Sequence, residues 1–303
     1  MKMAKIDSIV RRQLSRRSFM KGLIVAGLAG LDVMLLAQNG RLYAKKIEPF
    51  WLEVTQVRLR LPRLPKSFSG FRMAQISDMH VGGWMTAQRA ADYFKIVMDL
   101  SPDAVAMTGD FVMGYGRGRN VPQKIEKLVP VLEEMTRQIP VLGVLGNHDY
   151  IYGSAAITNM LQQAGVVYLN NSVSVIRHGD DVLHIAGVDD VMEGRPELDD
   201  VLKKLPSSDC SILLVHEPDF ADKSSSTGRF DLQISGHSHG GQVVLPFIGP
   251  PILPDMAHKY PSGLYRVGKM LLYTNRGAGM TQPYVRFNCR PEITVFTLEA
   301  ATP

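Results

Sequence analysis

The sequence has little cysteine. Its 303 residues include two, Cys210 and Cys289, which lie far apart in the chain. A thiolate metal site needs several cysteines at short spacings, so the sequence excludes one. A single disulfide between the two residues stays open. We favour two separate buried thiols instead, because Cys210 lies just before the apolar run at residues 212–215.

The apolar run nearest the N-terminus is shorter than a membrane span. Residues 22–36 form a run of about 15 residues that contains Asp32 and is rich in glycine, whereas a spanning helix needs about 20 apolar residues. Basic residues come before this run. That order is typical of a targeting segment, so we assign residues 1–46 to one. A permanent membrane anchor and a buried core helix are the alternatives, and cleavage after Ala44 stays open.

The pair Arg16-Arg17, followed by Phe19 and Lys21, resembles a twin-arginine export signal. That bacterial pathway carries proteins that are already folded. The resemblance implies that the twin-arginine export machinery is a partner. It also implies that the protein is exported across the cytoplasmic membrane, to the periplasm or the cell envelope. Peripheral association with the membrane or the envelope stays open.

Excess positive charge is absent from most of the chain, although the formal net charge is +5 and the pI is about 9.1. Residues 1–46 contain ten Lys or Arg and two Asp, a net charge of +8. The remaining residues contain 24 basic and 27 acidic side chains, a net charge of −3. The basic pI therefore belongs to the N-terminal segment, and we expect no nucleic-acid binding.

The rest of the chain lacks internal repeats and a Gly- or Pro-rich linker, so residues 47–303 are expected to form one domain. Short apolar runs typical of buried strands alternate with stretches of helical spacing, which predicts an α/β fold. Loops are predicted at residues 116–119 and 224–228. Strands are predicted at residues 54–61, 73–76, 104–107, 141–145, 212–215, 232–234, 264–267, 270–273 and 293–298, and helices at residues 86–100, 125–138 and 154–164.

Five polar clusters follow the predicted strands. Ligands in open α/β sheets gather at the carboxyl ends of the strands, so these clusters are expected to meet at one site. Carboxylate, imidazole and Asn oxygen ligands without cysteine suit Mn, Fe or Zn. Side chains two residues apart leave a strand on the same side, and glycines before the ligands allow sharp turns. The clusters are Asp78-Met79-His80, Gly109-Asp110, Gly146-Asn147-His148-Asp149, His216-Glu217 and Gly236-His237-Ser238-His239.

In this order, the clusters resemble the motif set of the calcineurin-like metallophosphoesterases, over about residues 71–300. The resemblance implies a four-layer α/β/β/α sandwich of two mixed sheets flanked by helices. It also implies two divalent metal ions that share a hydroxide and hydrolyse a phosphodiester or pyrophosphate bond. One ion would be held by Asp78, His80 and His239, and the other by Asn147, His216 and His237. Asp110 would bridge both ions.

The same resemblance makes His148 the catalytic histidine that is not a ligand, expected to protonate the leaving oxygen. Asp149 would orient His148, or would instead cap the following turn. Two other functions stay open, an exported phosphomonoesterase or nucleotidase and a non-catalytic binding scaffold on the same fold. A zinc protease is disfavoured, because the sequence has no His-Glu-x-x-His motif.

Two further segments indicate a subfamily within this family. Gly236 to Gln242 and Arg286-x-x-x-Arg290-Pro291-Glu292-Ile293 are similar to exported bacterial phosphodiesterases, which are often described as similar to UDP-2,3-diacylglucosamine hydrolases. The substrate is expected to be a phosphate ester, with lipid-linked and nucleotide-linked esters both open. A hydrolase of lipid A synthesis meets its substrate on the cytoplasmic side, so export argues against assigning that substrate here.

Several polar residues are expected to lie outside the site. His178, His184 and His258 match no motif position, and the Asp189-Asp190 pair is interpreted as a turn. Arg276 follows a predicted strand, where it could reach a substrate phosphate, and we favour an ion pair or a solvated side chain instead.

Overall fold

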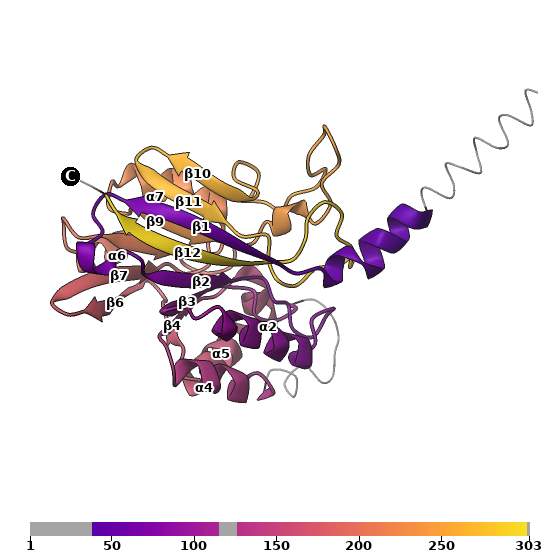
Figure 1. Cartoon of the computed structure of the whole chain (residues 1–303), viewed down its shortest axis with the longest axis horizontal. Coiled ribbons are helices and arrows are strands. Elements are labelled where there is room, and N and C mark those ends of the chain that lie inside the picture. Colours follow the sequence, from indigo (N-terminus) through magenta and orange to yellow (C-terminus); the bar gives the residue numbers. More distant parts are fainter. Residues whose placement is uncertain (1–37, 115–125, 302–303) are drawn as a thin grey trace, which may run out of the picture. The chain divides into compact units, whose positions relative to one another are not determined.

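The computed structural model describes residues 38–114 and 126–301 (Figure 1). The chain divides into two units, residues 1–43 and residues 44–303. Residues 38–46 are helical. Among the described residues, no helix combines the length and apolar character that a membrane span requires. The predicted apolar targeting run, residues 22–36, and the predicted loop at residues 116–119 lie outside the described residues.

The first sheet has six strands in the order β1-β12-β2-β3-β4-β5. Strand β12 is antiparallel to β2, and every other neighbouring pair is parallel, so the sheet is mixed. The strands are β1 (Glu53–Leu61), β2 (Arg72–Ile76), β3 (Ala104–Thr108), β4 (Val141–Val144), β5 (Val167–Tyr168) and β12 (Glu292–Ala300).

The second sheet also has six strands, in the order β10-β11-β9-β8-β7-β6. Its two edge pairs, β10 with β11 and β6 with β7, are antiparallel, and the strands between them are parallel. The strands are β6 (Ser172–His178), β7 (Asp181–Gly187), β8 (Ser211–Leu214), β9 (Leu232–Ser235), β10 (Gly263–Val267) and β11 (Met270–Thr274).

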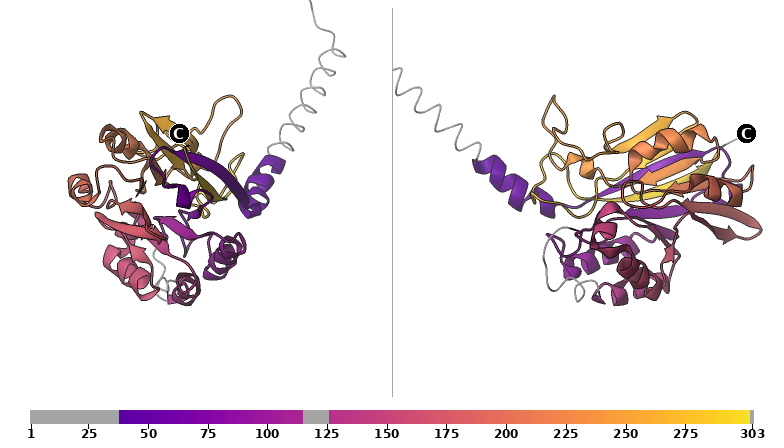
Figure 2. Two further views of the ribbon diagram at one scale, coloured as in Figure 1. Left: turned by 60° about the vertical axis from the view of Figure 1, so that its left-hand side comes forward. Right: turned by 180° about the vertical axis from the view of Figure 1, so that it is seen from behind.

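The two sheets pack face to face, and helices cover their outer faces (Figure 2). Met73, Leu214 and Phe296 are among the buried side chains between the sheets, and each such side chain contributes about 1.5–3 kcal/mol. The predicted four-layer α/β/β/α sandwich is confirmed. Helices α2 (Ala87–Asp99), α4 (Val129–Thr136) and α5 (Asn147–Gln163) cover the first sheet, and α6 (Leu198–Lys204) and α7 (Ala221–Ser226) cover the second.

The central strands are buried on both faces, which explains why their sequences are continuous apolar runs. Each strand predicted from such a run is present, with both ends within two residues of the prediction. Helix α2 follows its prediction too, because Thr86 caps its first turn by accepting a hydrogen bond from the Arg89 N–H at 3.2 Å.

Two local predictions were wrong. Residues 224–226 belong to α7 and not to a loop, because the Ser224 hydroxyl is buried and donates to Gln233 Oε1 at 2.6 Å. Helix α5 begins at Asn147, seven residues before its predicted start at Ser154. Gly146 is its N-cap, and Gly153, with a φ of 135°, interrupts it where the prediction placed its beginning.

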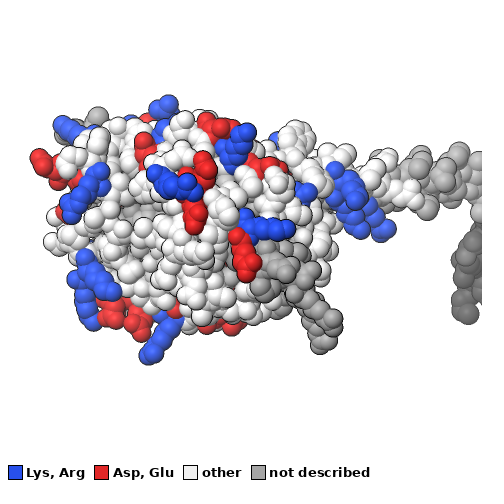
Figure 3. All heavy atoms as spheres, turned by 90° about the horizontal axis from the view of Figure 1, so that it is seen from below, with Lys and Arg blue, Asp and Glu red and all other residues white. Residues whose placement is uncertain are grey.

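Lysine, arginine and acidic side chains are interspersed on the face shown in Figure 3, without a large area of one sign. This distribution agrees with the small negative charge of residues 47–303 and shows no basic surface of the kind that binds nucleic acid on that face.

Candidate metal centre

The seven predicted metal ligands come together at the carboxyl ends of strands from both sheets. Asp78 and His80 follow β2, Asp110 follows β3, and Asn147 begins the helix after β4. From the second sheet, His216 follows β8, and His237 and His239 follow β9. All seven side chains are buried. Their assignment as ligands stays a prediction, but the structure brings together all the residues on which it depends.

Five of these residues have left-handed backbone conformations. The φ angles are 52° at Asp78, 48° at His80, 56° at Asp110, 68° at His237 and 51° at His239. Such conformations cost about 1–3 kcal/mol each in residues other than glycine, and they cluster at functional sites. The sequence suggested that the neighbouring glycines would carry the turns, whereas here the ligand residues adopt the strained conformations themselves.

The glycines before the ligands leave room for the side chains of the site. Gly109 has a φ of 91°, so glycine is needed there for its backbone conformation. Gly146 has an ordinary φ of −119°, but a Cβ at this position would overlap Asp110 Oδ1 and lie 2.7 Å from His216 Nε2. A Cβ at Gly236 would overlap the Asp78 carboxylate. Both positions are therefore glycine because another side chain would fill the site.

The first predicted ligand set has the atom spacing of one cation site. His80 Nε2 lies 2.9 Å from His239 Nε2, and His239 Nε2 lies 3.4 Å from Asp78 Oδ1. Two nitrogen or oxygen ligands at about 2.1 Å from one ion are themselves roughly 3.0–3.4 Å apart in octahedral or tetrahedral geometry. The three side chains therefore fit one divalent cation, as their grouping among the candidate metal clusters also indicates.

Asp110 connects this set to the second. Its Oδ2 atom lies 3.4 Å from His80 Nε2 and 3.2 Å from His216 Nε2. Asp110, His216 and His237 form another group whose ligand atoms all lie within 4.8 Å of one another. One carboxylate oxygen therefore faces both sets, which is the geometry that a bridging ligand requires.

Backbone carbonyls select the ring nitrogen that two of the histidines offer. His216 Nδ1 donates to the Thr108 carbonyl at 2.6 Å, which leaves Nε2, 3.2 Å from Asp110 Oδ2, as the nitrogen for a cation. His237 Nε2 donates to the Asp255 carbonyl at 2.9 Å, which leaves Nδ1 for a ligand. Hydrogen bonds of this type fix the tautomer and orientation of metal-binding imidazoles.

Most of the buried groups have pKa values that fit cation binding; the exception is His216, whose raised pKa means that it must lose a proton to bind a cation. Burial raises the pKa of Asp78 to about 6 and lowers the pKa values of His80 and His237 to about 3. Burial opposes charge on Asp110 and His216 too, but their mutual attraction lowers the pKa of Asp110 well below its usual range and raises that of His216 well above it. A buried carboxylate is stable when it is paired or coordinates a metal, and neutral imidazole is the ligand form.

Asn147 completes the set. Its Oδ1 atom is buried and, within the described residues, has no hydrogen-bond partner. A buried acceptor without a partner is unfavourable by about 1–3 kcal/mol. A divalent cation held with His216 and His237 would satisfy this oxygen, so the donor set fits two cations.

His148 is held beside the predicted ligands. Its backbone N–H donates to Asp110 Oδ1 at 2.9 Å, and its ring lies edge-on to the His80 ring with centroids 4.5 Å apart. Its Nδ1 accepts a hydrogen bond from the Gly114 N–H at 3.1 Å. The proton of the neutral ring is therefore on Nε2. Burial lowers the pKa of His148, although Asp110 opposes this.

Asp149 acts on the backbone before His148. Its Oδ2 accepts from the Gly146 N–H at 3.0 Å, and its Oδ1 accepts from the Val112 N–H at 3.2 Å. These bonds cap α5, which is the alternative role that the sequence left open for Asp149. They also join the β4 loop to the β3 loop. Any influence on His148 passes through these two loops, and the orienting role itself stays a prediction.

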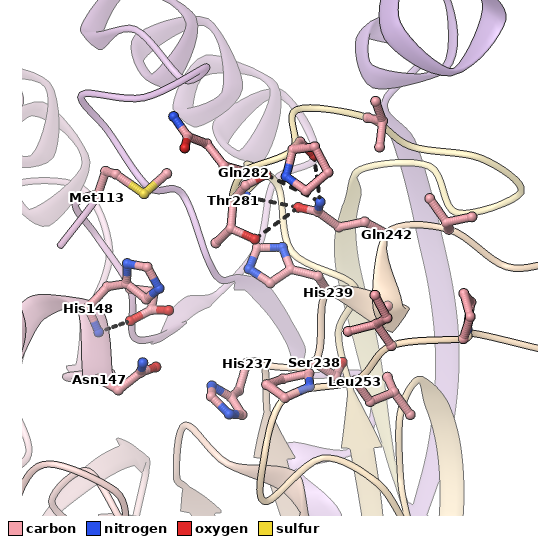
Figure 4. Close-up of a pocket in the computed structure, with 18 residues that line it drawn as sticks. Met113, Asn147, His148, His237, Ser238, His239, Gln242, Leu253, Thr281 and Gln282 are labelled. Atoms are coloured by element: carbon pink, nitrogen blue, oxygen red, sulfur yellow. Dashed lines mark hydrogen bonds between the residues drawn. The ribbon is translucent and has the colours of Figure 1, made fainter. Parts of the chain in front are cut away.

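A cavity of about 620 Å³ opens beside the predicted ligands (Figure 4). Asp110, Asn147, His148, His237 and His239 line one part of it. The opposite wall is mostly apolar. None of the described residues that line the cavity is Lys or Arg. The opposite wall includes Val243, Pro251, Ile252, Leu253, Pro254, Pro283 and Val285, whereas Met113 lies beside His148.

Sequence reasoning missed the role of Gln242 in this wall. Its Nε2 donates to the carbonyls of Thr281 and Pro283 at 3.2 Å each, and its Oε1 accepts from the Thr281 N–H at 2.8 Å. These bonds attach the segment around residue 281 to the loop after β9. A glutamine has no sequence signal for such a role, because both partners are backbone groups distant in the chain.

The residues set aside in the sequence have structural partners. Arg276 contacts Glu292 at 2.9 Å and Glu53 at 3.1 Å, so of the two favoured alternatives the ion pair is present. His184 lies 3.2 Å from Asp209. Cys210 and Cys289 are both free and buried, which confirms two separate thiols.

The Gly146→Ala variant should lose metal although it removes no ligand. The added Cβ would overlap Asp110 and crowd His216, and disturbed ligand orientation typically weakens metal binding about 10–100-fold. We therefore expect the variant to retain less metal than the wild-type protein after dialysis, with the metal content measured by mass spectrometry. Gly143→Ala on β4 is the control, because its Cβ would meet Met107 at an ordinary 3.4 Å. Equal metal content in the two variants would contradict the model of the site.

Comparison with known proteins agrees with this geometry. Residues 71–241 match the family model described as calcineurin-like phosphoesterase. The chain is 35% identical to the uncharacterized metallophosphoesterase YkuE of Bacillus subtilis over 95% of this chain and 99% of that protein. It is 28% identical to the phosphodiesterase YaeI of Escherichia coli, over 94% and 99% of the two chains. This chain therefore belongs to the calcineurin-like metallophosphoesterase family and is a metal-dependent phosphoester hydrolase.

Proposed function

We propose that the chain hydrolyses a phosphodiester, or a pyrophosphate bond flanked by a large group, at the metal centre. The observation that carries this proposal is the contrast between the two sides of the cavity. Ligand residues line one side, and a mostly apolar wall, with no Lys or Arg among its described residues, lines the other. A diester has a second esterified group that an apolar wall can bind. The relative from Escherichia coli is named a phosphodiesterase, which supports the same reaction.

The proposed centre holds Asp78, His80 and His239 on one cation, Asn147, His216 and His237 on the other, and Asp110 between them. Its nitrogen and oxygen donors suit Mn, Fe or Zn. When bound, the two cations supply Lewis-acid charge for the phosphoryl oxygens and activate water.

His148 supplies the proton for the leaving group. Its Nε2 carries the proton because Nδ1 accepts from the Gly114 N–H. The hydrogen bond from its backbone N–H to Asp110 holds the main chain beside the centre, and the bond from the Gly114 N–H orients the ring. Through Gly146 and Val112, Asp149 stabilises the two loops that carry these groups.

The two alternatives are weaker. A phosphomonoesterase or nucleotidase binds a terminal phosphate with two negative charges, for which Arg is the preferred bidentate partner, and the described residues that line this cavity include no Arg. A non-catalytic scaffold has no need for a complete ligand set, whereas here every predicted ligand and His148 are buried in one cluster.

The Mn²⁺-loaded protein should hydrolyse bis-nitrophenyl phosphate with a kcat/KM at least about tenfold above that for nitrophenyl phosphate, a difference of roughly 1.4 kcal/mol in transition-state binding. The apolar wall can contact the second nitrophenyl group, which the monoester lacks. Both rates are measured by release of nitrophenol, and metal-free protein is the control. Preference for the monoester would favour the alternative enzyme, and equal activity without metal would exclude the two-metal reaction.

We also propose that the protein is exported through the twin-arginine pathway, as the leader at residues 1–46 and its similarity to exported phosphodiesterases indicate. Replacing Arg16 and Arg17 by Lys keeps the charge and removes the guanidinium pair. We expect this variant to stay in the cytoplasm, measured by cell fractionation and immunoblotting. Replacing Arg11 and Arg12 by Lys is the matched control and should leave export unchanged. Export of both variants would contradict the twin-arginine assignment.

A further inference from the structure

A loop without charged residues stands beside the cavity. We call residues 243–254 the apolar loop; they contain Val, Leu, Pro, Phe, Ile and Gly only. Phe247 is fully exposed, and Ile252 and Ile248 are 78% and 75% exposed. These three are the most exposed of the large apolar side chains among the described residues. Contiguous exposed apolar groups mark a surface that binds a membrane or another molecule.

The tip of the apolar loop is a closed turn. Leu245 and Gly249 exchange backbone hydrogen bonds, with the Gly249 N–H to Leu245 O at 2.9 Å and the reverse bond at 3.0 Å. Polar backbone groups at the tip are thereby partly satisfied, which insertion into lipid requires. Phe247 has a φ of 65°, a strained conformation for an aromatic residue. Exposure and strain are both unfavourable for folding, so the stability of the fold does not explain a phenylalanine at this position.

Further amphipathic residues flank the apolar loop. Asn288 links two segments, because its Nδ2 donates to Val244 O at 3.2 Å and its N–H donates to Glu48 Oε2 at 2.9 Å. Around Glu48, the side chains of Phe50 and Trp51 are about half exposed, at 52% and 50%. In Figures 1 and 2 the apolar loop projects at the same end of the domain as this segment.

The segment around Glu48 has the composition of a membrane interface. Aromatic side chains such as Trp51 are enriched where the headgroups meet the hydrocarbon. The exposed Lys45 and Lys46 precede this segment, and each lysine near an anionic bilayer strengthens binding. The chain next to them is tied to the body by the bond from the Arg286 N–H to the Ala44 carbonyl, at 2.9 Å.

The apolar loop also forms part of the cavity wall. Val243, Ile252 and Leu253 line the cavity, and Ile252 is one of the three most exposed apolar residues. An apolar surface therefore continues from the exposed tip to the predicted metal centre without an intervening charged residue of the loop. An acyl chain could follow this surface while its phosphate reaches His148 and the ligands.

We propose that the apolar loop inserts into the surface of a lipid bilayer, and that the cavity takes the phosphodiester of a membrane lipid as substrate. The choice of substrate rests on the proposed function, whereas insertion does not. A bilayer fits better than a protein partner. The tip of the apolar loop exposes aliphatic and aromatic side chains next to a segment with basic residues, and the tip itself offers no charged group for specific pairing with a protein.

The first experiment measures insertion locally in the full chain. Ile248→Cys is labelled with an environment-sensitive fluorophore, since both native cysteines are buried. Vesicles of phosphatidylglycerol and phosphatidylcholine should shift its emission to the blue. Val175→Cys on β6, 39% exposed, is the control and should not respond. No shift at residue 248, an equal shift at residue 175, or a shift that depends on protein concentration without vesicles would overturn insertion.

The second experiment separates the substrate from the reaction. Phe247→Ser with Ile248→Ser should lower hydrolysis of phosphatidylglycerol in vesicles by about tenfold or more, because two apolar side chains no longer partition into the bilayer. Hydrolysis of soluble bis-nitrophenyl phosphate should not change, since neither residue lines the cavity. Wild-type protein that cleaves the soluble diester and no vesicle lipid overturns the lipid substrate alone. Wild-type protein that hydrolyses neither the soluble diester nor the vesicle lipid overturns the proposed function. In that case the fluorophore at residue 248 still tests insertion by itself.

Discussion

Asp110→Asn should reduce hydrolysis of an aryl phosphodiester by at least about 10³-fold. Asp110 Oδ2 faces both His80 and His216, at 3.4 and 3.2 Å. An amide keeps the shape of the side chain and its Oδ1 acceptor for the His148 N–H, but it removes the negative charge between the two predicted cations. The rate and the bound metal are measured together, by nitrophenol release and by mass spectrometry.

Asp209→Asn is the matched control for this substitution. Asp209 Oδ2 lies 3.2 Å from His184 Nε2, the same separation as that between Asp110 and His216, but on a partly exposed side chain outside the site. It should therefore retain activity. His216→Ala should be as impaired as Asp110→Asn, because it removes a ligand of the same centre. Full activity in either site variant would refute the proposed metal centre.

His148→Gln should have an effect that depends on the leaving group. Proton transfer to a leaving oxygen typically contributes about 10²–10⁴-fold, and the Nε2 proton of His148 is placed for this role because Nδ1 accepts from the Gly114 N–H. A nitrophenolate leaves readily without a proton, whereas an alkoxide does not. We therefore expect a loss in this range for an alkyl phosphodiester and a much smaller loss for bis-nitrophenyl phosphate.

The dependence on the leaving group distinguishes proton donation from a structural role. A disturbed metal centre would slow both substrates equally and would also lower the metal content. His258→Gln is a suitable control, because the His258 side chain is 60% exposed and matches no site position. Equal losses on both substrates with normal metal content would assign His148 to binding of the phosphate and not to protonation.

The predicted strands are correct because their signal is local. Central strands such as β3, β8 and β9 are buried on both faces, so a short apolar run followed by a polar cluster identifies them without knowledge of their neighbours. The start of α5 was not predictable in this way. It depends on Asp149, which accepts the Gly146 N–H of its own turn and also the Val112 N–H of a distant loop.

The exposure of the apolar loop is a second feature that could not be predicted from the sequence. Residues 243–254 lack charge, a composition that suits a buried segment equally well. Exposure of Phe247 and Ile248 follows from the closed turn between Leu245 and Gly249, which directs the tip away from the body. Whether an apolar segment is core or surface depends on what packs against it, and the sequence contains no record of that.

The sequence by itself determined the residue types of the metal centre and their order along the strands, because the chemistry of divalent cations restricts the ligands to carboxylates, imidazoles and amides. Only the tertiary structure decided how they meet. The Asp110 oxygen between the two ligand sets, the free nitrogens of His216 and His237, and the left-handed conformations at Asp78, His80 and His237 all depend on loops from two sheets packed together. Contacts between atoms so distant in the chain are set by packing, and local sequence patterns do not specify them.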